Sequence, residues 1–273
     1  MILWKKQASA AWLAAYEAHI EEFAGLGLAI IARPGRTRSL VQVICPRRSK
    51  AERLQRNFGG TIEVLSSDWS SVSPPHPPIR IGRRLEIESQ PPLSPGSDDR
   101  LRLIIPAAGA FGTGEHSTTA MSLRLLEEAT RKLPVGWRLL DAGTGTGILA
   151  LAARRLNAVE VLGLDNDPRA VAHARRNARL NRIGRAKFIT ADILRWKPHT
   201  RYEVVTANLF SELLIAALPI LQRALRPDGW LIVSGILREQ TESVVHALTK
   251  ARFHLAQQRR RGKWVALLSS RKS

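Results

Sequence analysis

The chain of 273 residues is poor in cysteine, in long apolar runs and in acidic residues. Its single cysteine, Cys45, excludes an intramolecular disulfide and a cysteine-rich metal site. No apolar run reaches the roughly 18 residues that a membrane span needs, and no His, Cys and carboxylate cluster has metal-ligand spacing, so we expect no metal. The stretch from Met1 to Lys6 is apolar and then basic, the reverse of a signal peptide. These absences predict a cytoplasmic protein without membrane contact.

Acidic residues are too few to balance the cations. The chain has 23 Asp and Glu residues against 42 Lys and Arg residues, for a formal net charge of +19. A field of this sign favours polyanionic surroundings such as RNA. The alternative is an arginine-rich composition spread over solvated faces, and the arginines between Arg175 and Arg185 fit either interpretation. The interleaved aromatic pattern of an RNA recognition motif is absent.

Residues 1–66 predict a small ferredoxin-like α+β domain. Its elements follow the order strand, helix, strand, strand, helix, strand. Apolar runs predict the strands 2–4, 28–32, 40–44 and 61–65, and helical spacing predicts helices that begin near Ser9 and Ser49. Residues 67–105 form a connecting segment, in which the proline-dense stretch 70–78 predicts a stiff linker.

Residues 106–273 predict an α/β domain with a doubly wound parallel sheet. Helical patterns alternate with apolar runs, which is typical of repeated strand–helix–strand units. The expected strands are 138–141, 160–165, 187–190, 203–207 and 230–234. The tail predicts a terminal antiparallel hairpin from 253–257 and 263–268.

The most informative stretch, residues 139–147, reads LLDAGTGTG. Glycines permit a sharp turn and leave no side chain between the backbone and a ligand, which predicts a nucleotide-type site at a strand end. A dinucleotide fingerprint would need a third glycine where Ile148 stands, which disfavours a dehydrogenase. The alternative, a turn without a ligand, would need only one glycine. The pattern D-x-G-x-G-x-G, with Asp141, Gly143 and Gly145, resembles motif I of class I S-adenosylmethionine (SAM) methyltransferases.

Three further polar residues follow later expected strands. Asp165 lies 24 positions beyond Asp141 and is a candidate to accept hydrogen bonds from a ribose diol, whereas Asp167 predicts a helix cap before a proline. Asp192 is a candidate acceptor for the adenine amine, with Ile193 packed on the ring, and a loop acid is the alternative. The carbonyl of Asn208 can orient an amine and leave its lone pair free, unless the residue is only a cap.

The string AFGTGEHSTT at residues 110–119 precedes the helix that leads into the sheet. Its glycines and hydroxyls, with Phe111 and Gly112, are expected to wrap the amino-acid end of the cofactor. Phe111 and Phe210 are candidate walls of the acceptor pocket. His116 is a candidate for either an acceptor-site or a structural role.

Taken with GLDNDP at 163–168, ANL at 207–209 and SGIL at 234–237, these motifs resemble the PrmA family. Its members are lysine and N-terminal methyltransferases of ribosomal protein L11. The resemblance implies cofactor roles for Thr119, Gly143, Asp165 and Asn208, with SAM as the methyl donor. It also implies that residues 1–66 recognise the ribosomal protein, and the positive charge extends the expectation to contact with ribosomal RNA.

Other functions stay open at this point. The chain departs from the family pattern at Glu115, Ser117 and Phe210, which concerns the substrate more than the cofactor. One alternative is the same chemistry on the lysines of another protein or on RNA. A second is a non-catalytic SAM-binding module that docks on the ribosome. The sequence predicts no oligomeric state.

Overall fold

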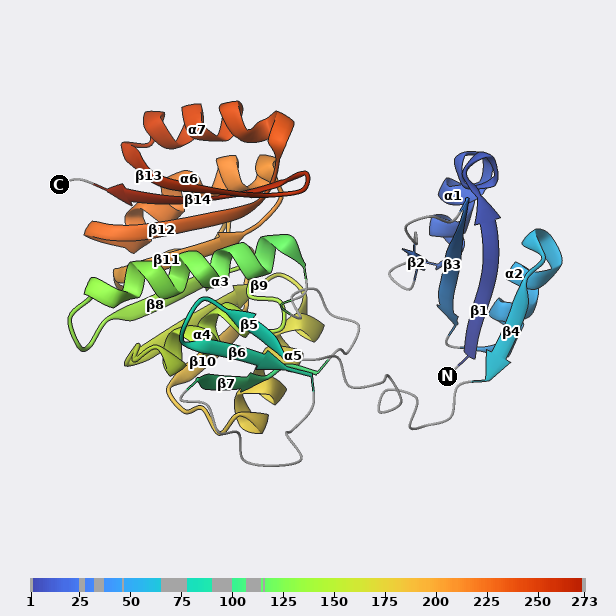
Figure 1. The fold of residues 1–273 in the computed structure, drawn as a ribbon, viewed down its shortest axis with the longest axis horizontal. Helices are drawn as coiled ribbons and strands as arrows, with labels where there is room; N and C mark the ends of the chain where they lie inside the picture. The colour runs from blue at the N-terminus through green and yellow to red at the C-terminus, as the bar shows by residue number, and fades with distance from the viewer. Residues whose placement is uncertain are drawn as a thin grey trace. The chain divides into compact units, whose positions relative to one another are not determined.

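A computed structural model describes residues 2–24, 28–31, 37–45, 47–64, 78–89, 100–106, 114 and 116–271 (Figure 1). The chain divides into two compact units, Met1–Pro74 and Pro75–Ser273. None of the described helices combines the length and the apolar character that crossing a membrane requires. Two predicted site residues, Phe111 and Gly112, lie outside the described residues.

The first unit has the predicted ferredoxin-like topology. Its elements are β1 (Ile2–Ser9), α1 (Ala10–Ala24), β2 (Leu28–Ile31), β3 (Arg38–Cys45), α2 (Arg48–Phe58) and β4 (Thr61–Val64). The sheet has the order β2-β3-β1-β4, and every neighbouring pair is antiparallel. Alternate strand residues, including Trp4, Val41 and Val43, are buried together with Leu54 of α2. The period-two burial of strands therefore gives this small unit its own core.

The second unit contains the predicted doubly wound sheet, with strands in the order β10-β9-β8-β11-β12-β14-β13. The strands are β8 (Arg138–Ala142), β9 (Glu160–Asp165), β10 (Ala186–Thr190), β11 (Tyr202–Asn208), β12 (Leu225–Leu237), β13 (Phe253–Arg261) and β14 (Trp264–Arg271). The first five are parallel. The predicted hairpin is present, and its last strand, β14, lies between β12 and β13 and runs antiparallel to both.

Helices cover both faces of this sheet. One face packs against α3 (Ser117–Ala129), α4 (Ile148–Arg155) and α5 (Pro168–Leu180), and the other against α6 (Ser211–Ala224) and α7 (Thr241–Lys250). Two short 3₁₀ helices, Thr130–Lys132 and Arg238–Gln240, complete the unit. Neighbouring residues serve opposite cores: Leu139 belongs to the first and Leu140 to the second. Both faces are apolar, as expected of a buried parallel sheet.

A small sheet belongs to the core of the second unit. It consists of β5 (Ile79–Ile81), β6 (Leu85–Glu88) and β7 (Leu101–Ile104). Figure 1 shows these strands beside α3 and α4. Ile81, Leu85, Ile87 and Leu103 are buried in the same apolar cluster as Leu123 of α3. Part of the segment that connects the two domains in sequence therefore packs with the second unit.

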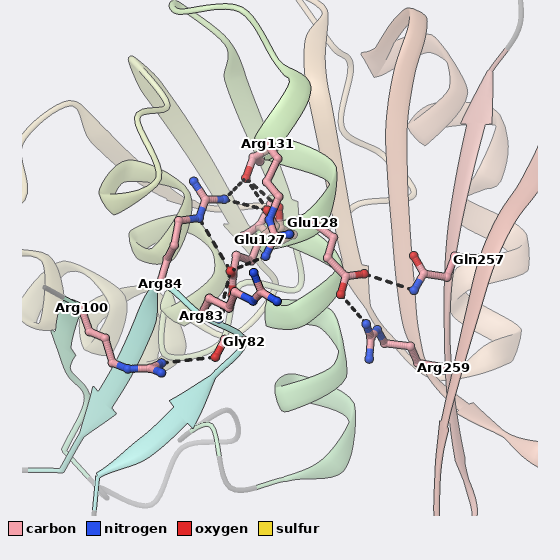
Figure 2. A network of polar contacts seen from close by, with 11 residues as sticks. Gly82, Arg83, Arg84, Arg100, Glu127, Glu128, Arg131, Gln257 and Arg259 are labelled. Carbon is pink, nitrogen blue, oxygen red and sulfur yellow. Dashed lines mark hydrogen bonds and ion pairs between the residues drawn. The ribbon is translucent and has the colours of Figure 1, made fainter. Parts of the chain in front are cut away.

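A buried carboxylate fixes the small sheet to α3 (Figure 2). The side chain of Glu127 is 1% exposed. Both of its oxygens accept from the Arg83 backbone N–H at 3.1 Å, and they form ion pairs with Arg84 and Arg131 at 3.7 and 3.1 Å. A Cβ at Gly82, whose φ is +55°, would lie 1.7 Å from Glu127 Oε2. Only glycine at position 82 leaves room for the Glu127 carboxylate, and the carboxylate in turn binds the backbone of this turn through the Arg83 N–H.

We expect Glu127→Gln to lower the free energy of unfolding by about 2 kcal/mol, because it removes the charge of a buried carboxylate that binds the Arg83 N–H and two arginines. The matched control is Glu128→Gln, one residue further along α3. Glu128 pairs with Arg259 and Gln257 of β13, but its side chain is 36% exposed, so its loss should cost less than about 1 kcal/mol. Urea denaturation of both variants measures the difference, and equal losses would contradict the buried role of Glu127.

Candidate active site

The carboxyl ends of the parallel strands surround a cavity of about 500 Å³. Five of the predicted cofactor-binding residues line it: Gly143, Gly145, Asp165, Asp192 and Asn208. They come from four different strand ends, which meet because β9, β8 and β11 are neighbours and β10 follows β9. The fold therefore brings together residues that are up to 65 positions apart, counting from 143 to 208.

The glycine loop after β8 forms the floor of the cavity. Gly143, Gly145 and Gly147 all have positive φ angles, of 72°, 53° and 81°. The Gly143 N–H donates to the carbonyl of Leu164 at 2.9 Å, which fastens the loop to β9. A Cβ at Gly143 would lie 2.4 Å from Cδ2 of Leu209. Side chains at these three positions would strain the backbone, and a side chain at Gly143 would also collide with Leu209 in the cavity wall.

Asp141 lies beneath this loop and does not line the cavity. It is 1% exposed, and its two oxygens accept hydrogen bonds from the hydroxyls of Thr144 and Thr206, each at 2.7 Å. Burial raises the pKa of its carboxyl from 3.8 to about 6, against the opposing effect of these two hydrogen bonds. Of the predicted cofactor residues, Asp141 is thus placed as a support for the loop rather than as a contact.

Asp165 presents a carboxylate whose orientation is fixed by the backbone. One oxygen accepts from the Gly145 N–H at 2.9 Å, and the other accepts from the Asp167 N–H at 3.0 Å. Each oxygen keeps a further lone pair for a donor in the cavity. Asp167 instead caps α5 by accepting from the Arg169 N–H at 2.8 Å, with Pro168 as the first helical residue. The two neighbouring acids therefore have separate roles, as the sequence predicts.

Asp192 and Ile193 form the wall that follows β10. One oxygen of Asp192 accepts from the Leu194 N–H at 2.9 Å, and the other lies 3.7 Å from the guanidinium of Arg195. Ile193 is 6% exposed and places an apolar surface beside this carboxylate. An acceptor next to an apolar wall suits the edge and the face of an aromatic base.

Asn208 supplies an unpaired acceptor at the end of β11. Its amide Nδ2 donates to Thr118 Oγ1 at 3.4 Å. Its Oδ1 is buried and has no hydrogen-bond partner among the described residues. Leaving a buried acceptor unsatisfied costs about 1–3 kcal/mol, so this atom points to a donor on a ligand. The hydroxyl of Thr119 is likewise buried and unpartnered within the described chain, although Thr119 does not line the cavity.

His116 has the structural role that the sequence offered, and its ring also lies at the cavity. It caps α3, since its Nδ1 accepts from the Thr118 N–H at 3.4 Å and lies 2.7 Å from Thr118 Oγ1. It also lines the cavity, where its ring packs edge-on against Trp264 with 5.2 Å between the ring centroids. Burial lowers the pKa of His116, and the neighbouring Lys263 lowers it further. Both effects favour the neutral imidazole.

Some residues of the cavity wall were missed from sequence. Trp264 enters from β14 and Leu213 from the first turn of α6. Trp264 carried no local signal, because it reaches the site only through the insertion of β14 beside β12. Leu213 belongs to an apolar helical face that is indistinguishable from an ordinary core face. Phe210, predicted as a wall, lies at the cavity and is 75% exposed.

Residues 27–272 match the family model described as ribosomal protein L11 methyltransferase (PrmA). The chain belongs to this family. A ribosomal protein L11 methyltransferase from Pelobacter propionicus is 38% identical over 211 residues, which cover 76% of this chain and 68% of that protein. One from Geobacter metallireducens is 40% identical over 214 residues, which cover 76% and 68%. A crystal structure of ribosomal protein L11 methylase from Lactobacillus delbrueckii subsp. bulgaricus has a TM-score of 0.66 at 31% identity, covering 72% of this chain and 100% of that one.

These matches confirm the predicted PrmA family and the predicted class I methyltransferase fold. The chain spans about two thirds of the length of these two named relatives. Membership of a methyltransferase family also confirms the predicted enzyme class, whose methyl donor is S-adenosylmethionine.

The buried Asp141 makes the stability of the second unit of this PrmA-family protein depend on pH. Because its folded pKa of about 6 exceeds the unfolded value of 3.8, the folded state keeps a proton that the unfolded state releases between these values. The free energy of unfolding should therefore fall as the pH rises from about 4 to 6, by up to about 3 kcal/mol from this group. Asp141→Asn keeps the shape and lacks the titration. In urea denaturation across this range, the stability of the unmodified protein should fall relative to that of the Asp141→Asn variant, and a constant difference between the two would contradict the assignment.

Proposed function

We propose that this PrmA-family chain transfers methyl groups from S-adenosylmethionine to lysine ε-amino groups of ribosomal protein L11, and also to its α-amino group. The observation that carries the proposal is the buried Oδ1 of Asn208, which has no hydrogen-bond partner in the described part of the chain and belongs to a residue in the wall of the cavity beside Gly143 and Asp165. Relatives that are 38% and 40% identical bear the name of this activity, which supplies the substrate.

The residues of the cavity fit the methyl donor. The volume of about 500 Å³ lies within the range of about 300–1,000 Å³ that small-molecule sites occupy. We assign the free lone pairs of Asp165 to the ribose hydroxyls, and Asp192 with Ile193 to the adenine. The glycine loop, with Thr119, Phe111 and Gly112, is assigned to the amino-acid end. When bound, the donor supplies a methyl group carried by a sulfonium sulfur, and this sulfur is left as a neutral thioether once the methyl group has been transferred.

The acceptor amine would meet Asn208. Its Oδ1 accepts an N–H of the amine and leaves the nitrogen lone pair free, while Thr118 holds the amide nitrogen. A lysine must first lose its proton, because its ordinary pKa is about 10.4. The apolar side chains of Leu209, Phe210 and Trp264 line the same cavity and would favour the neutral amine by desolvation. Fixing the amine and methyl about 3–3.5 Å apart lowers the barrier further.

The three segments of the chain would divide this work. We assign recognition of the ribosomal protein to the ferredoxin-like residues 1–66, connection to 67–105 and methyl transfer to 106–273. Support for the first assignment is that these residues fall within the compact unit Met1–Pro74, whose described core residues form a cluster separate from the clusters of the second unit. The cytoplasmic location and the contact with ribosomal RNA stay predictions from sequence.

The ribose assignment predicts different effects for the two neighbouring acids. Asp165→Asn should weaken SAM binding by about 10- to 100-fold, because hydrogen bonds to charged groups contribute about 1.5–3 kcal/mol. Asp167→Asn should leave the affinity within about threefold, since Asp167 contacts only the start of α5. Isothermal titration calorimetry measures both. Equal affinities for the two variants would remove Asp165 from the ribose site.

The amine assignment predicts a defect in turnover without a defect in donor binding. Asn208→Ala should lower kcat for methylation of L11 by about 100-fold, the cost of misplacing a reacting group by about 1 Å. Its dissociation constant for SAM should stay within about threefold. Single-turnover kinetics with labelled SAM and purified L11 separates the two quantities. Unchanged turnover would show that the acceptor is held by another group.

A further inference from the structure

The edge of the parallel sheet opposite the cavity carries two grooves lined with cations. One, of about 540 Å³, includes Glu160, Arg185 and Lys187 at the starts of β9 and β10. The other, of about 630 Å³, precedes β11 and includes the cations Lys197, Arg201 and Arg223. Both lie where the parallel strands begin, whereas the cavity of the proposed active site lies where they end.

Arg138, the first residue of β8, connects the two grooves. In the strand register it stands opposite Glu160 of the first groove. Its guanidinium donates to Thr200 Oγ1 at 3.0 Å and to the carbonyl of Arg201 at 2.8 Å, both in the second groove. Three steps between strands, from β10 to β11, span about 14 Å. The grooves therefore belong to one surface, which we call the basic edge: Arg138, Arg185, Lys187, Lys197, Arg201 and Arg223.

The cations of the basic edge are largely without acidic partners. Arg185, Lys187, Lys197, Arg201 and Arg223 are exposed, and no ion pair is found for them within the described residues. Between Asp167 and Asp192 the chain contains seven Arg and Lys residues and no acid. Glu203, beside Arg138, is already paired with Arg138 and Arg226 at 3.7 and 3.1 Å. Glu160 is a second acid at this edge and lies in the first groove, so the six cations of the basic edge stand against two acids and the surface keeps a net positive charge.

Two arginines beside the first groove occupy a backbone conformation that favours glycine. Arg182 and Arg185 both have φ of +52°, whereas Gly184 between them carries no such positive angle. The left-handed conformation costs an ordinary residue about 1–2 kcal/mol. An arginine therefore stands at position 185, in the groove, although the backbone conformation there favours glycine.

We propose that the basic edge binds the phosphodiester backbone of RNA. A row of cations along grooves complements a chain of phosphates, and guanidinium groups, which form most of the row, bind phosphate oxygens in pairs. The inference does not depend on the proposed methyl transfer, since none of these residues lines the cavity at the opposite edge. Bound there, RNA would leave the active-site cavity open to a protein substrate.

The test compares two variants of the full-length protein with equal loss of charge. The edge variant combines Arg185→Gln, Lys187→Gln, Arg201→Gln and Arg223→Gln. The control combines Lys250→Gln, Arg252→Gln, Arg260→Gln and Arg261→Gln, which are exposed cations of α7, β13 and the turn between them. Fluorescence anisotropy with a short single-stranded RNA measures the affinity at several salt concentrations. The plot of log K against log salt concentration has a negative slope. The magnitude of this slope should decrease by about 3 in the edge variant, at about 0.7 for each of the four lost phosphate contacts.

The control should keep the slope of the unmodified protein within about 1. Equal effects of the two variants would overturn the proposal, because net charge would then explain the binding. It is also overturned if the edge variant retains RNA affinity but loses binding to vesicles of anionic phospholipid. Methylation of isolated L11 should be the same in all three proteins, so a failure of the proposed activity is distinguishable.

A single substitution guards against misfolding of the fourfold variant. Arg185→Gly relieves the left-handed backbone, so the thermal unfolding midpoint should not fall. The salt slope should nevertheless decrease by about 0.7. An unchanged slope in a stable Arg185→Gly protein would remove this arginine from the RNA contact and contradict the proposal.

Discussion

Parallel pairing of β10, β9, β8 and β11 is the constraint on which the site depends. Because neighbouring strands run in the same direction, every loop that follows them emerges at one edge. The glycine loop, Asp165, Asp192 and Asn208 each follow a different strand, and only this pairing places them around one cavity. The buried Asp141 carboxylate supports the arrangement by binding the loop at Thr144 and the neighbouring strand at Thr206.

The sequence predicts what is local and periodic. Alternating helices and strands indicate the doubly wound sheet. The distinction between Asp165 and Asp167 follows from Pro168, because proline is favoured at the first position of a helix and so marks Asp167 as the cap. The burial of Asp141 is not determined by its neighbours in sequence. It depends on Thr206, 65 residues away, so a motif that marks the site does not reveal which acid reaches the ligand. Trp264 could not be foreseen for the same reason, since its place depends on how β14 inserts.

The orientation of the Asn208 side chain depends on the residues that cap α3. Its amide nitrogen faces the hydroxyl of Thr118, which in turn contacts Nδ1 of His116. Since the Thr118 N–H also points at that nitrogen, Nδ1 acts as an acceptor and the hydroxyl donates to it. The hydroxyl oxygen is then free to accept from the amide nitrogen of Asn208, and the amide Oδ1 has no partner among the residues that the structure describes. The neutral state of His116, favoured by burial through a lowered pKa, is consistent with this direction of hydrogen bonds.

Helix dipoles explain part of the positive charge at the opposite edge, but not all of it. In strand–helix units the helices end where the next strands begin, and Arg154, Arg179 and Arg223 stand in the last turns of α4, α5 and α6. Cations there are stabilised by the negative helix end. Arg185, Lys187 and Arg201 lie beyond the helices, in turns and strand starts, and gain no such stabilisation. No ion pair is found for these three cations among the described residues, and the single acid of the first groove, Glu160, does not balance both Arg185 and Lys187. A polyanionic partner therefore accounts for these cations better than the fold does.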